Sequence, residues 1–78
     1  MSIKAYQTSD LYYAAYLKVA HVPFVEAVRE PTGRVVFVFE CVEGLRELKN
    51  KFFSRTALVS AMDYADEVKA LKALMFNT

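Results

Sequence analysis

Three tyrosines, Tyr12, Tyr13 and Tyr16, lie within five positions of the stretch TSDLYYAAYLKVAHV, residues 8–22. Exposed aromatic rings can stack on the bases of single-stranded nucleic acid, where they usually alternate with basic side chains. Lys18 is the one lysine in this stretch. At about 100° per residue, Tyr12 and Tyr16 share the inward face of a helix, and Tyr13 is the tyrosine expected at the surface. The stretch therefore predicts core packing, with hydroxyl groups reaching the rim of the core.

The single histidine, His21, and the single cysteine, Cys41, are the other candidates for chemistry. An enzyme would need His21 to converge with Tyr13 and a carboxylate such as Asp10 or Glu43, and no spacing in the chain indicates this. One histidine and one cysteine are also too few for a tetrahedral metal site. We expect no catalytic residue, no metal and no cofactor. His21 is predicted at a helix end and Cys41 as a small buried side chain.

Four basic residues within ten positions are the strongest indication of nucleic-acid binding in this sequence. They are Arg46, Lys49, Lys51 and Arg55. They spread around a predicted helix and have acidic neighbours, and the whole chain carries a net charge of only +1. Such a balance gives no long-range field that would recruit a polyanion. A solvated helix face is the simpler interpretation, and a nucleic-acid contact is the alternative.

Length and composition indicate one dense domain, 1–78. Hydrophobic residues make up 55% of the chain, and two glycines and two prolines leave little room for long loops. One cysteine allows no internal disulfide, so we expect the cytoplasm. No window is apolar enough to cross a bilayer and no signal sequence opens the chain, which predicts a soluble, unprocessed protein.

Hydrophobic periodicity and turn residues divide the chain into six elements. The expected strands are 3–7, 24–30 and 34–40, and the expected helices are 10–20, 43–54 and one opened by Ser60 that continues to Met75. Thr8, Ser9 or Asp10 can cap the first helix, and EPTG supplies the turn of a hairpin. Asp63 completes an approximate capping box with Ser60.

The fold class predicted from this order, β-α-β-β-α-α, is α+β with a three-stranded mixed sheet and three helices. A right-handed crossover through the first helix would make strands one and two parallel, and the hairpin makes strand three antiparallel to strand two. Strand three is predicted to be central because both of its faces are apolar.

The second apolar face of this sheet is the strongest candidate for an interface. If the three helices cover the face with Phe37 and Phe39, then Val36 and Val38, with Val28 or Val25, form an exposed apolar strip. A helix that crosses over would remove this strip. Otherwise two copies would pair their sheets, and we expect a homodimer, because association is a common way for small domains to gain buried area.

The order of the segments TSDLYYAAYL, VVFVFE and VKALKALMF resembles that of a family of small bacterial domains of unknown function. The resemblance spans nearly the whole chain. It implies a bacterial or phage origin and brings no catalytic or binding residue with it.

These observations predict a non-enzymatic interaction module that self-associates through the sheet at Val28, Val36 and Val38. The alternative is a nucleic-acid-binding accessory protein, and an enzyme is the third hypothesis. Added salt separates the first two, because a phosphate-driven complex weakens steeply with salt and an apolar interface does not.

Overall fold

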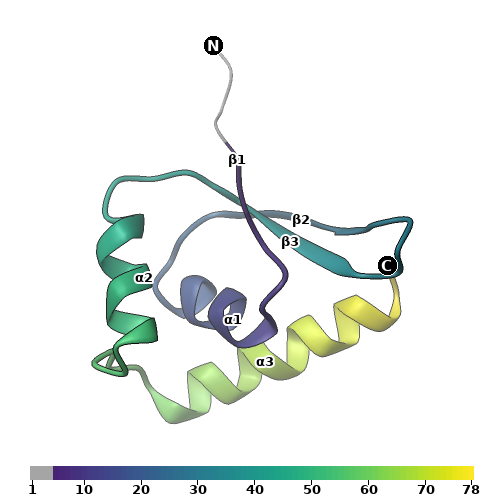
Figure 1. Ribbon diagram of the computed structural model, residues 1–78. Coiled ribbons are helices and arrows are strands. Elements are labelled where there is room, and N and C mark those ends of the chain that lie inside the picture. The colour runs from purple at the N-terminus through teal and green to yellow at the C-terminus, as the bar shows by residue number, and fades with distance from the viewer. Residues whose placement is uncertain (1–4) are drawn as a thin grey trace.

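Six elements follow one another in the predicted order in the computed structural model, which describes residues 5–78 (Figure 1). The elements are β1 (Ala5–Thr8), α1 (Leu11–Val19), β2 (Phe24–Arg29), β3 (Val35–Glu40), α2 (Leu45–Phe53) and α3 (Ala61–Phe76). Most predicted boundaries are right to within one or two residues. Positions 3 and 4 of the first predicted strand lie outside the described residues. None of the described helices is long and apolar enough to cross a membrane.

The sheet is antiparallel throughout, so the predicted mixed sheet is wrong. Its strand order is β1-β3-β2, with β3 antiparallel to both neighbours. β1 and β2 do run in the same direction, as a crossover requires, but β3 lies between them and they never pair. A mixed sheet would have needed β2 beside β1. The predicted central position of β3 is confirmed.

All three helices lie on one side of the sheet, and the core fills the space between them (Figure 1). Phe37 and Phe39 of β3 point into this core and are almost completely buried. Leu17 of α1 and Leu71 of α3 meet them from the helical layer. The helices therefore form one layer and the sheet the other, and no element from the described part of the chain covers the second sheet face.

Hydrogen-bonding side chains fix where two helices begin. The Asp10 carboxylate accepts the backbone N–H groups of Tyr12 and Tyr13 at 2.9 and 3.1 Å, so Asp10 is the N-cap among the three predicted candidates. The Ser60 hydroxyl accepts the Asp63 N–H, which confirms the predicted start of α3.

Arg29 holds the hairpin against the C-terminal end of α3. Its guanidinium donates to the carbonyl oxygens of Met75 and Thr78, both at 2.8 Å, and of Gly33 at 2.7 Å. The Met75 carbonyl lies in the last turn of α3, where carbonyl groups lack partners within the helix and a positive charge is favourable.

We therefore expect Arg29→Lys to lower the free energy of unfolding by roughly 1–2 kcal/mol, because an ammonium group cannot reproduce three divergent hydrogen bonds. Arg34→Lys is the matched control, since Arg34 only pairs with Glu30 at the surface and such pairs contribute about 0–1 kcal/mol. Urea unfolding measures both variants. Equal losses in the two would contradict the assigned role of Arg29.

α1 and α2 both end in a Schellman arrangement with a left-handed residue that is not glycine. After α1, the N–H of His21 donates to Lys18 and that of Val22 to Leu17, with φ +65° at His21. After α2, Arg55 has φ +63° and the Thr56 N–H donates to Lys51. Glycine is the usual residue at this position because a Cβ atom disfavours the left-handed region.

His21→Gly should raise the free energy of unfolding by about 0.5–1 kcal/mol, the relief of left-handed strain minus the extra freedom of glycine in the unfolded chain. Ala20→Gly is the control. Ala20 has φ −80°, so glycine there brings no relief and should destabilise. Thermal unfolding of both variants tests the assignment, and a destabilised His21→Gly protein would refute it.

Candidate functional site

The sheet face opposite the helices is the candidate interface, and we call it the open face. Val36 and Val38 of β3 alternate with the core residues Phe37 and Phe39 and therefore point to this face. Their cross-strand partners belong to the same face: Gln7 of β1 and Glu26 of β2 pair with Val38, and Val28 of β2 pairs with Val36.

The apolar area of the open face is smaller than the sequence predicts. The helices do cover only the opposite face, yet Val36 and Val38 are just 9% and 7% exposed, while Val28 is 40% exposed. Both valines belong to the central strand, where Gln7 and Glu26 lie beside Val38 and Val28 lies beside Val36. Val25 lies where the β2–β3 register shifts, and it is also exposed. The open face thus has an apolar centre in which Val28 is far more accessible than Val36 and Val38.

Polar side chains border this centre. Gln7 and Glu26 flank Val38, and a shallow hollow of about 350 Å³ lies toward the hairpin end. It is lined by Gln7, Thr8, Ser9, Glu30, Arg34 and Val36. Glu30 and Arg34 neutralise each other across a 3.0 Å ion pair. An apolar centre within a polar rim is the usual anatomy of a protein interface.

The four basic residues proposed for nucleic acid do not form one surface. Arg46 and Lys49 line a hollow of about 410 Å³ beside Tyr6 and Cys41. Lys51 lines a different hollow, between α2 and α1. Arg55 follows α2 in its left-handed position. The structure therefore places Arg46 and Lys49 at one hollow and Lys51 at another.

The tyrosines contribute to the core in a different way from that predicted. Tyr13 is buried and Tyr12 is exposed, so the sequence interpretation of these two was wrong, whereas Tyr16 is buried as predicted. α1 packs against the sheet and both other helices, so more than one of its faces is buried, and Ala14 next to Tyr13 is inaccessible as well. A single inward face does not describe such a helix.

Tyr13 lies at the centre of an aromatic cluster formed by Tyr6, Tyr13, Tyr16, Phe52 and Phe53. Its ring centroid is 5.3 Å from those of Phe52 and Phe53, and its hydroxyl is 3.0 Å from the Tyr6 hydroxyl. The pKa of Tyr13 is raised well above its ordinary value. Burial away from water is the largest cause, and the hydrogen bond with Tyr6 is the second. Tyr13 is therefore a structural residue.

The residues considered for catalysis do not converge. Tyr13 is in the core, whereas His21 lines a surface hollow with Lys18 and the carboxylates of Asp63, Asp66 and Glu67. Lys18 already pairs with Glu67 at 3.0 Å. Cys41 is exposed, so the predicted buried side chain was wrong. Within residues 5–78 no cluster of His, Cys, Asp and Glu side chains has a metal-binding arrangement.

Sequence reasoning missed the hollow that Lys51 lines, which lies between α1, α2 and the connection from α2 to α3. Its volume is about 350 Å³. It is lined by Tyr16, Val19, Ala20, Leu48, Lys51, Thr56, Leu58 and Val59. No local signal in the sequence gives the path of residues 54–60, and this path forms the third wall.

Tyr13 also predicts how stability depends on pH. The folded protein keeps this phenol neutral, whereas the unfolded chain releases its proton above about pH 10. The contribution of Tyr13 to the free energy of unfolding is therefore intact below about pH 10 and falls at higher pH. Tyr13→Phe should therefore lose stability less steeply than the wild type in urea unfolding between pH 8 and 11.5. Tyr12→Phe, at an exposed position, should keep the wild-type slope. Parallel slopes for Tyr13→Phe and the wild type would contradict this.

Comparison with known proteins gives one match, to a family model that covers residues 3–77. Neither the curated proteins nor the solved structures show a significant similarity to this chain. The family model spans the entire described fold except its last residue, and it agrees with the resemblance noted from the sequence. The chain belongs to the family described as domain of unknown function DUF5659.

Proposed function

We propose that this chain is a small non-enzymatic interaction module of the bacterial cytoplasm, which self-associates through the open face of its sheet. One observation carries the proposal: the three helices cover the same sheet face, so within residues 5–78 the valine-centred second face has no layer over it. A sheet is normally buried on its apolar faces, and a second copy supplies the missing layer.

The residues of the open face suit a symmetric contact. Val28 and Val36 are cross-strand partners toward the hairpin end of the face, and Val38 lies two residues along β3 from Val36 on the same face. In an isologous dimer each valine group packs on the same group of the other copy, and the polar side chains of Gln7 and Glu26 stay at the rim. The low exposure of Val36 and Val38 means that much of the apolar area gained would come from Val28 and its neighbours.

Nucleic-acid binding through Arg46, Lys49, Lys51 and Arg55 has weaker support. Only Arg46 and Lys49 line the same hollow, and Lys51 lines another. Two neighbouring cations make few phosphate contacts, and affinity for nucleic acid grows with the number of such contacts.

Light scattering over a concentration series tests the proposal. We expect a mass of twice 8.9 kDa at high concentration, with little dependence on added salt. Val28→Lys should weaken the dimer at least about tenfold, because each interface would then bury two unpaired charges. Val28 is half-exposed on an edge strand, so this variant should still fold, which circular dichroism verifies.

Met62→Lys is the matched control, because Met62 is an exposed apolar residue on the helical side of the protein. It should leave the dimer intact. A wild type that stays monomeric at every concentration, or a dimer weakened equally by both substitutions, would contradict self-association through the open face.

A further inference from the structure

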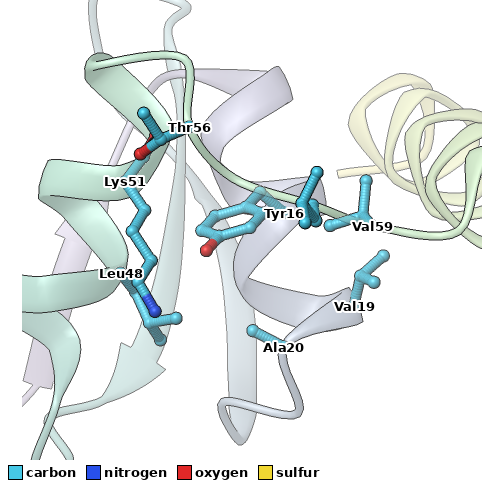
Figure 2. A pocket seen from close by; sticks show the side chains of 8 residues that line it. Tyr16, Val19, Ala20, Leu48, Lys51, Thr56 and Val59 are labelled. Atoms are coloured by element: carbon cyan, nitrogen blue, oxygen red, sulfur yellow. The ribbon is translucent and has the colours of Figure 1, made fainter.

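The hollow between α1, α2 and the α2–α3 connection has the features of a ligand site, and Figure 2 shows it from close by. Val19, Ala20 and Leu48 form apolar walls on the side of the two helices, Val59 adds a wall from the connection, and the almost fully exposed Leu58 lies at the edge. Its volume of about 350 Å³ falls at the lower end of the range for small-molecule pockets, roughly 300–1,000 Å³. The space suits a short apolar body.

The hydroxyl of a largely buried tyrosine, Tyr16, faces this space. Tyr16 is only 5% exposed, and its ring packs on Phe52 with the centroids 5.4 Å apart. Figure 2 shows its hydroxyl oxygen turned toward α2, on the side where Lys51 lies. Within residues 5–78 this hydroxyl makes no hydrogen bond, unlike those of Tyr6, Tyr13 and Tyr64. The hydroxyl is not among the buried polar atoms that lack a partner, so it is accessible from the hollow and free to bond a ligand there.

Lys51 supplies a positive charge to the same hollow. Its ammonium group takes part in neither of the two ion pairs found among residues 5–78. The backbone around it is fixed, because the Lys51 carbonyl accepts the N–H groups of Thr56 and Ala57 at 2.9 and 3.1 Å. These hydrogen bonds attach the α2–α3 connection to Lys51, the residue that carries the charge.

We propose that this hollow binds a small carboxylic acid with a short apolar body, whose carboxylate accepts hydrogen bonds from the Lys51 ammonium and the Tyr16 hydroxyl. A carboxylate suits these two groups because it offers acceptor oxygens to two donors and balances one positive charge. The apolar body contacts Val19, Leu48 and Val59. The hollow lies on the helical side of the sheet, so this inference is independent of self-association through the open face.

An NMR titration of the full chain with sodium hexanoate tests the proposal, with 1-hexanol and hexylammonium as probes of the same length. We expect saturable shifts for hexanoate at the amide groups of Val19, Ala20, Leu48 and Val59. Hexanoate should bind about tenfold more tightly than 1-hexanol, which is the contribution of about one charge-assisted hydrogen bond, and hexylammonium should not bind.

Lys51→Gln keeps most of the aliphatic stem and removes the charge, so it should reduce hexanoate affinity to that of 1-hexanol. Lys49→Gln removes an equal charge from the same helix outside this hollow, and should change the affinity less than about twofold. Tyr16→Phe should weaken hexanoate and leave 1-hexanol unchanged. The proposal is overturned if hexanoate gives no saturable shift at the hollow, if hexanoate and 1-hexanol bind equally, or if both lysine variants weaken binding alike.

Discussion

The fold depends on the insertion of β3 between β1 and β2. This strand hydrogen-bonds on both edges, and its alternate side chains, Phe37 and Phe39, anchor the core against the helices. Its remaining side chains, Val36 and Val38, are apolar as well, although no helix covers them. One strand thus determines both the antiparallel character of the sheet and the apolar centre of its open face. Both faces of β3 are apolar, but the helices cover only one face of the sheet. The proposed interface follows from this difference.

The helical layer is stabilised largely through side chains and helix ends. Tyr13 links the sheet to α2 through its hydrogen bond with Tyr6 and its contacts with Phe52 and Phe53. Arg29 links the hairpin to the end of α3. The Schellman arrangements after α1 and α2 direct the chain sharply away from each helix, and the second one starts the connection that closes the Lys51 hollow. The strained backbone at Arg55 therefore helps to form that hollow.

Local signals predicted the parts of this structure that depend on local physics. Ser60 with Asp63 marked the start of α3, the EPTG turn marked the hairpin, and the two-sided apolar pattern of VVFVFE marked the central strand. Features set by tertiary contacts were not predictable in this way. Tyr13 is buried and Tyr12 exposed, the reverse of the prediction, because α1 is buried on several sides. The prediction of a mixed sheet was wrong because a crossover fixes only that β1 and β2 run the same way and says nothing of which strand separates them. The Lys51 hollow depends on the path of a loop, which periodicity does not describe.

The most direct test of the central claim is an isotope-filtered NOE experiment on an equal mixture of ¹³C-labelled and unlabelled protein, which reports only contacts between copies. The account predicts intermolecular NOEs from the methyl groups of Val28, Val36 and Val38, and none from Leu58, which is 96% exposed on the helical side. Intermolecular NOEs confined to Leu58, Met62 or Phe76, with none from the open face, would show that the protein associates through its helices and would contradict the account.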